Sequence, residues 1–264
     1  MREESIDELF SVALLGDEND DVAWDAVTKL HLIGSQEVLE KAIALTHSEN
    51  EYYRARGANI IGQLGVQSGI ASTSFIPERL QAALDLLRSE TAILPLTSAI
   101  SAIGHIGQEQ GILEILPFRN HPNRNVRWYV AMSLGGHDIP EIVSALMELM
   151  HDAEPRVRDW ATFGIGARLD ADSDAIRDAL FERLQDEDCD TRGEAAVGLA
   201  KRKDLRVLPF VIDELLREEH GDLYEEAAQY LLGFDAVDTD GWDSLRYVEE
   251  LRSRFNLRDQ TISE

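Results

Sequence analysis

The sequence predicts an all-α solenoid, a superhelix built from about seven helical hairpins. A short frame recurs along nearly the whole chain, its copies stand about thirty residues apart, and apolar stripes at helical spacing lie between them. A hairpin of that length cannot bury its own apolar face, so consecutive hairpins must stack. We therefore expect a single repeat domain over residues 1–264 with no β-sheet.

The recurring frame reads Val-Arg-x-x-apolar-x-x-small-apolar-Gly. Its clearest copies are residues 125–135 and 156–166, and it also fits residues 52–62 and 190–200. The residues at the first frame position, the anchors, are Val22, Tyr53, Pro95, Val126, Val157, Thr191 and Leu223. Their spacings are 31, 42, 31, 31, 34 and 32 residues, which is the length of a two-helix repeat.

Each unit is expected to hold two helices joined by a polar turn. The apolar stripe of Ile142, Leu146 and Leu149 marks a first helix, and residues 151–155 form the turn before the second. Five glycines are expected to end the second helices in the left-handed conformation that glycine favours: Gly62, Gly104, Gly135, Gly166 and Gly233.

Two segments depart from the repeat. The 42-residue spacing predicts a loop insertion over residues 66–79, where small polar residues gather, and such a loop is either mobile or functional. Residues 234–264 are expected to form an acidic linker followed by a C-terminal capping helix near residues 244–255.

The charge of the chain restricts its partners. A formal charge of −25 repels nucleic-acid phosphate, so we expect no nucleic-acid binding. The acid either serves solubility alone, attracts a basic partner or mimics a polyanion. No apolar run reaches the roughly 18 residues of a membrane span, so no membrane binding is expected. The single cysteine, Cys189, excludes an internal disulfide and indicates a cytoplasmic location.

The repeat resembles the HEAT family, in particular the short HEAT-like repeats first named from phycobilisome lyases. The resemblance covers nearly the whole chain and implies an internal ladder, in which the arginine of each second helix bonds an acidic residue of an adjoining repeat. The matching positions are Arg54, Arg127, Arg158 and Arg192. The first, third and seventh repeats carry Ala23, Leu96 and Tyr224 instead, so the ladder should be broken there.

The sequence contains no convincing motif for catalysis or metal binding. HEAT-like deoxyhypusine hydroxylases carry His-Glu pairs that bind iron, and this sequence contains no His-Glu dipeptide. Acidic neighbours disfavour the thiolate of Cys189, which makes it a poor nucleophile. No glycine-rich phosphate loop or nucleophile elbow is present. We therefore expect no catalytic residue, no metal and no cofactor.

Aromatic residues give the best positive signal. In HEAT solenoids the second helices line the concave face, and frame positions three, four and seven should point away from the packed side. In the fourth and fifth repeats these positions hold Trp128, Tyr129, Met132, Asp159, Trp160 and Phe163. The side chains either fill the core between repeats or form a recognition patch, because Trp and Tyr anchor interfaces strongly.

The leading interpretation is a non-catalytic interaction module that binds another protein, expected to be basic, through its concave face. One alternative, from the family resemblance, is a bilin (tetrapyrrole) lyase or isomerase subunit. Another is an immunity or antitoxin-type inhibitor, and a third is a structural adaptor with no single ligand. The sequence indicates no oligomeric state.

Overall fold

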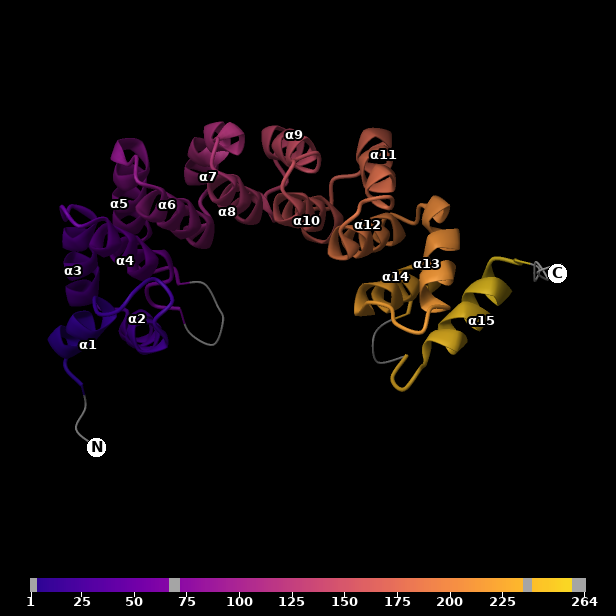
Figure 1. The fold of residues 1–264 in the computed structure, drawn as a ribbon, viewed down its shortest axis with the longest axis horizontal. Helices are drawn as coiled ribbons and strands as arrows, with labels where there is room; N and C mark the ends of the chain where they lie inside the picture. Colours follow the sequence, from indigo (N-terminus) through magenta and orange to yellow (C-terminus); the bar gives the residue numbers. More distant parts are fainter. Residues whose placement is uncertain (1–3, 67–71, 235–238, 258–264) are drawn as a thin grey trace. The chain divides into compact units, whose positions relative to one another are not determined.

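The protein forms two compact units, Met1–Leu134 and Gly135–Glu264, in a computed structural model (Figure 1). The structure describes residues 4–66, 72–234 and 239–257, and within these ranges every regular element is a helix. The prediction of an all-α solenoid is therefore confirmed. None of the helices in the described ranges is long and apolar enough to cross a membrane.

The first unit is a run of helical hairpins. Within it α1 packs on α2, α3 on α4 and α5 on α6, while α7 and the short helix η1 pack on α8; the second helices α2, α4, α6 and α8 pack each on the next. Its elements are α1 (Ile6–Ala13), α2 (Asp21–Ile33), α3 (Gln36–Thr46), α4 (Glu51–Gly62), α5 (Ile76–Ser89), α6 (Ile93–Ile106), α7 (Glu109–Ile115), η1 (Leu116–Asn120) and α8 (Arg124–Leu134).

The second unit repeats this plan. There α9 packs on α10, α11 on α12 and α13 on α14, the second helices α10, α12 and α14 pack in series, and α15 covers α13 and α14. Its elements are α9 (Pro140–Leu149), α10 (Pro155–Phe163), η2 (Gly164–Arg168), α11 (Asp174–Arg183), α12 (Cys189–Lys201), η3 (Leu205–Val207), α13 (Leu208–Leu215), α14 (Asp222–Leu232) and α15 (Ser244–Arg254).

Local sequence explains where many of these helices begin. Ser5 and Glu8 form a capping box at the start of α1, and the side chains of Asp20 and Asp188 accept hydrogen bonds from the first turns of α2 and α12. Proline occupies the first turn of α9 and α10, where its missing N–H costs nothing. Each of the seven anchors lies within the first three residues of a second helix.

Four of the five glycines do not end a helix in the left-handed conformation. Gly62 is the last residue of α4 and Gly104 lies inside α6, and neither has positive φ. A Cβ atom on Gly62 would lie 2.9 Å from Ala102 Cα, and one on Gly104 would lie 2.6 Å from Ser133 Oγ. Glycine is therefore needed at these sites for close helix packing, and the cap prediction is wrong for them.

In the second unit only Gly233 has the expected left-handed cap, with φ 73°. At the preceding boundary the left-handed residue is Gly136, with φ 99°, rather than Gly135. Gly166 lies in η2, a turn of π-helix, where a Cβ atom would lie 2.9 Å from Glu194 O on α12. Gly166 thus belongs with the packing glycines.

Two buried arginines bind carbonyl groups that the ends of second helices leave unpaired. Arg79 donates to Ile61 O at 2.8 Å and Gly62 O at 2.7 Å at the end of α4. Arg202 donates to Ile165 O at 2.7 Å and to the carbonyls of Gly166 and Leu169 around η2. A cation at a helix C-terminus satisfies these acceptors and suits the helix dipole. The sequence pattern did not reveal either arginine.

Parts of the two irregular segments lie outside the described residues. Within the predicted insertion, residues 67–71 are not described, and α5 begins at Ile76 after Phe75, which has φ 53°. In the C-terminal segment, residues 235–238 and 258–264 are not described. The capping helix α15 covers Ser244–Arg254, and the Asp243 side chain accepts a hydrogen bond from Arg246 N at its start.

Candidate binding surface

The four ladder arginines share one local contact. In each, Nη1 donates to the carbonyls of the residues five and six positions earlier, which form the turn between the two helices of the same hairpin. The arginines are Arg54, Arg127, Arg158 and Arg192, and the nearest contact of each is 2.9 Å. These side chains therefore fix the hairpin turn.

Arg54 and Arg158 also reach a carboxylate of the next repeat. Arg54 Nε lies 2.6 Å from Glu90 Oε2, and Arg158 lies 2.8 and 2.7 Å from the two carboxylate oxygens of Asp186. The side chains of Arg158 and Asp186 are only 9% and 3% exposed. The Arg158 guanidinium holds the pKa of the Asp186 carboxyl below its usual value against the opposing effect of burial. These ladder arginines bind the hairpin turns and thus have a structural role.

The predicted aromatic residues form one pair in each unit. On α8 in the first unit, Trp128 and Tyr129 meet edge to face with ring centroids 4.6 Å apart, and Met132 lies one turn further along. On α10 in the second unit, Trp160 and Phe163 meet edge to face at 5.6 Å. All five side chains are half-buried.

Several carboxyl groups of the second unit lie close enough to influence one another. Asp159 on α10, Asp190 and Glu194 on α12 and Glu226 on α14 lie on three second helices that pack in series. Asp159 and Glu194 are half-buried, and no ion pair joins either of them to another described residue. We name Asp159, Trp160, Phe163 and Glu194 the acidic–aromatic face.

The two half-buried carboxyls hold protons unusually well. Burial raises the pKa of Asp159 to about 6, and the charges of Asp188 and Asp190 raise it further. Burial raises the pKa of Glu194 to about 7, with added repulsion from Asp159, Glu226 and Asp190. Near neutral pH this face therefore carries crowded negative charge.

Such a surface can receive a cation. Half-buried carboxylates attract Lys or Arg, and an indole ring binds the same groups through its face. Within the described ranges no three His, Cys, Asp or Glu side chains are grouped so as to hold a metal ion. The exposed Arg168 lies 5.9 Å from the Phe163 ring centroid.

Sequence reasoning missed Glu194, although the frame contained the signal. Frame position four holds Tyr129 and Trp160 in the fourth and fifth repeats, and it holds Glu194 and Glu226 in the sixth and seventh. Reading that position through every repeat would have placed these carboxylates beside the aromatic side chains.

At frame position four of the second repeat, the side chain has a structural role. Arg56 is 1% exposed, its guanidinium lies 4.3 Å from the Trp24 ring centroid, and its Nε donates to Tyr52 Oη at 2.9 Å. Arg56 Nη2 also donates to Asp17 O, so this group fixes the loop before α2. Trp24 therefore covers a buried cation.

Comparison with known proteins identifies the family of this chain. A profile of HEAT repeats matches residues 109–171 and 143–233. Protein YibA of Escherichia coli K12 is 30% identical over 232 residues, which cover 84% of this chain and 79% of YibA. The chain belongs to the HEAT-repeat family. The predicted family resemblance is thereby confirmed.

Solved structures agree with this assignment. The crystal structure of E. coli YibA matches this HEAT-repeat chain with a TM-score of 0.69 and 25% identity, covering 93% of this chain and 92% of YibA. The archaeal HEAT-like repeats protein of Thermococcus onnurineus NA1 matches with a TM-score of 0.54 and 17% identity, covering 88% and 97%. The second likeness shows a shared fold alone. HEAT repeats typically serve as protein-interaction scaffolds.

Proposed function

We infer that the chain is a non-catalytic binding module that holds a basic protein on the acidic–aromatic face of its second unit. The observation that carries this inference is the half-buried carboxyl pair of Asp159 and Glu194, on the packed helices α10 and α12, together with the edge-to-face pair of Trp160 and Phe163 on α10. Repulsion between half-buried carboxylates costs folding free energy. Such a cost is typical of a binding site, where a bound partner supplies the missing positive charge.

A Lys or Arg side chain of the partner would relieve the repulsion. Placed between Asp159 and Glu194 it would favour both ionised forms, and placed against the Trp160 indole it would gain about 0.5–2 kcal/mol from the ring face. Half-buried Trp160 and Phe163 would supply the apolar contact, and Trp is enriched among residues that dominate binding energy.

The charge of the whole chain supports the same partner class. A net charge of −25 accelerates encounters with basic proteins and repels acidic ones. In the first unit, Trp128, Tyr129 and Met132 remain the candidate contact residues of α8. The cytoplasm remains the proposed compartment, because the one cysteine, Cys189, is free and exposed.

Affinity capture tests the proposal. The immobilised wild-type chain should retain from a lysate of its own cells a protein with positive net charge. The Asp159→Asn/Glu194→Gln variant should lose it, as should Trp160→Ala. A matched control is Glu249→Gln/Glu250→Gln on α15, which removes the same charge at exposed positions of the same unit.

The purified partner then gives a quantitative answer. We expect the Asp159→Asn/Glu194→Gln variant to lower affinity about tenfold or more, as truncation of central interface groups does, and the α15 control to change it less than about twofold. Equal affinity of the partner for the wild-type and Asp159→Asn/Glu194→Gln chains would show that the acidic–aromatic face is not part of the interface.

A further inference from the structure

A second surface lies on the first helices of the same unit. An open groove with a volume of about 620 Å³ runs along α9, and an adjoining hollow of about 500 Å³ continues it past the end of α11. Pro140, Val143, Met147 and Ala171 form its apolar floor, and His151 lies where the two hollows meet. We name these five residues the α9 groove.

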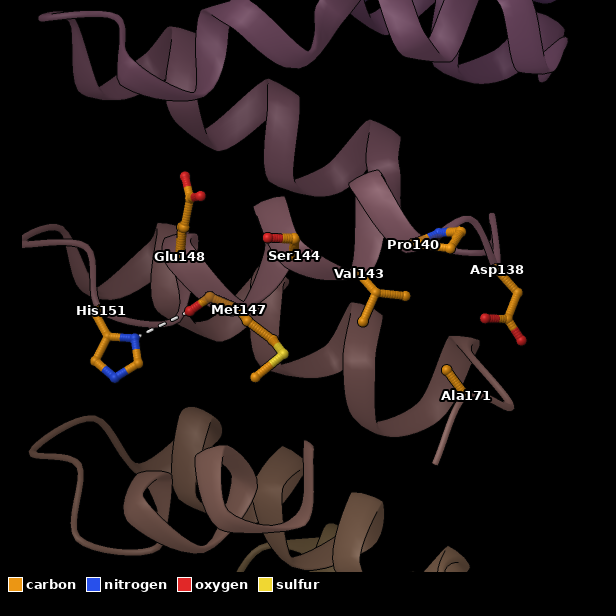
Figure 2. A pocket seen from close by; sticks show the side chains of 8 residues that line it. All are labelled: Asp138, Pro140, Val143, Ser144, Met147, Glu148, His151 and Ala171. Atoms are coloured by element: carbon orange, nitrogen blue, oxygen red, sulfur yellow. Dashed lines mark hydrogen bonds between the residues drawn. The ribbon is translucent and has the colours of Figure 1, made fainter. Parts of the chain in front are cut away.

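Side-chain directions show a continuous stripe. Val143, Met147 and His151 extend to the same side of α9, and Ala171 faces them from the segment before α11, while Glu148 points away (Figure 2). Val143 and Met147 are half-buried, whereas Ile142, Leu146 and Leu149 elsewhere on α9 are buried and α9 packs on α10. The groove is thus an apolar strip between two first helices.

The repeat irregularity explains the opening. In the first unit α3 packs on α5 and α5 on α7. Between α9 and α11 the repeat is 34 residues long, and the extra length falls in the π-turn η2 and in residues 169–173. The two helices are joined at one end, where Arg183 Nη1 donates to Met150 O at 2.9 Å. At the other end residues 169–173 intervene.

The rim of the α9 groove is acidic. Residues 138–151 and 170–187 contain ten Asp and Glu against two Arg. Both arginines are bound to carboxylates of this unit, Arg177 to Asp172 and Arg183 to Asp186. The side chains of Glu182 and Glu187 are 62% and 81% exposed, and each also lies 3.4 Å from a basic side chain of this unit, His151 and Arg158 respectively.

We propose that the α9 groove docks a basic amphipathic helix of another protein. Apolar side chains at positions i, i+4 and i+7 would lie on Val143 and Met147, and Lys or Arg beside that stripe would meet Glu182 and Glu187. A ten-residue α9 is about 15 Å long, so an occupant of about three turns covers it. Methionine adapts to varied apolar side chains. A second copy of this chain does not fit, because its net charge is also strongly negative.

Peptide binding measured by fluorescence anisotropy tests the proposal. The probe is a labelled leucine–lysine peptide with leucines at i, i+3, i+4 and i+7, and its control has the same composition in scrambled order. We expect the amphipathic probe to bind about tenfold more tightly than the scrambled one. Equal binding of both peptides would overturn the groove and leave only general charge attraction.

Variants locate the site. Glu182→Lys/Glu187→Lys should weaken probe binding about tenfold, while Glu249→Lys/Glu250→Lys, which makes the same charge change on α15, should weaken it less than about twofold. Met147→Ala should weaken binding severalfold without any change of charge. Equal losses from the two charge-reversal variants would overturn the proposal, as would full binding by Met147→Ala.

This inference is separate from the acidic–aromatic face. Asp159→Asn/Glu194→Gln should leave probe binding unchanged, so failure of one surface does not decide the other. Circular dichroism of each variant must match the wild type, and the scrambled-peptide comparison on the wild-type chain decides the outcome where a variant unfolds.

Discussion

Glu194 on α12 is pushed to a pKa of about 7 by burial and by the carboxylate of Asp159 on the neighbouring α10. Asp159 in turn has a pKa of about 6, above its ordinary value of 3.8, while that of Glu194 is ordinarily 4.5. Both groups therefore bind protons more tightly in the folded chain than in the unfolded chain. That difference makes stability depend on pH.

The sign of the pH dependence follows from proton counting. Between about pH 4 and pH 7 the folded state holds more protons than the unfolded state, so the free energy of unfolding falls as pH rises. We expect the Asp159→Asn/Glu194→Gln variant to escape this loss and to exceed the wild type at pH 8 by on the order of 1–3 kcal/mol. Urea denaturation of both chains at several pH values measures this difference in the free energy of unfolding. Parallel profiles for wild type and variant would contradict the electrostatic coupling.

The ion pair of Arg158 and Asp186 should be a main support of the second unit. Because both side chains are almost inaccessible, Asp186→Asn removes the nearer carboxylate of a buried cation, which keeps only the exposed Glu187 at 3.4 Å, and should cost about 3–5 kcal/mol of stability. The exposed pair of Arg177 and Asp172 is a control, since Asp172→Asn should cost about 1 kcal/mol or less. Similar costs for the two variants would show that burial does not set the strength of these pairs.

Gly166 should tolerate no side chain. A Cβ atom there would lie 2.9 Å from Glu194 O and 3.2 Å from Gly198 Cα, both backbone atoms that cannot rotate away. Gly166→Ala should therefore destabilise the chain by about 1–3 kcal/mol through overpacking. Gly221→Ala is the matched control, because no atom lies within 4 Å of its Cβ position and its φ is −80°. Thermal melting that ranks the two variants equally would contradict the close packing.

The accessibility of Trp160 and the stability of its alanine variant distinguish a binding role from a packing role. As a contact residue it should be quenched by acrylamide in a chain that keeps no other tryptophan, and Trp160→Ala should change stability by no more than about 0.5 kcal/mol. If the ring instead fills the core, truncation should cost about 3–5 kcal/mol. Strong protection from acrylamide together with a large loss of stability would assign Trp160 to the core.

The repeat could be predicted from the sequence because each hairpin packs on the next in the same way, which requires similar residues at equivalent positions. The anchors fall at the start of each second helix, where Pro95, Val126, Val157 and Thr191 are buried, although Val22 in the first repeat is exposed. The role of the glycines was harder to predict, because a glycine near a helix end looks the same whether it caps, as Gly233 does, or packs, as Gly166 does. Only the neighbouring helix distinguishes the two cases.

The candidate site was predicted in part for a related reason. Trp160 and Phe163 share one helix, so helical spacing alone places them together. The crowding of Asp159 and Glu194 depends on the contact of two helices from different repeats. Buried Arg79 and Arg202 likewise depend on carbonyls of distant residues, which no local pattern reveals.

Calorimetric titration with octa-arginine in buffers of different ionisation enthalpy tests the binding surface most directly. A cation on the face lowers both raised pKa values, so at pH 6.5 binding should release on the order of one proton. The Asp159→Asn/Glu194→Gln variant should release none and bind about tenfold more weakly, while Glu249→Gln/Glu250→Gln should behave as the wild type. Equal affinity and equal proton release in all three chains would contradict a cation-binding face at Asp159 and Glu194.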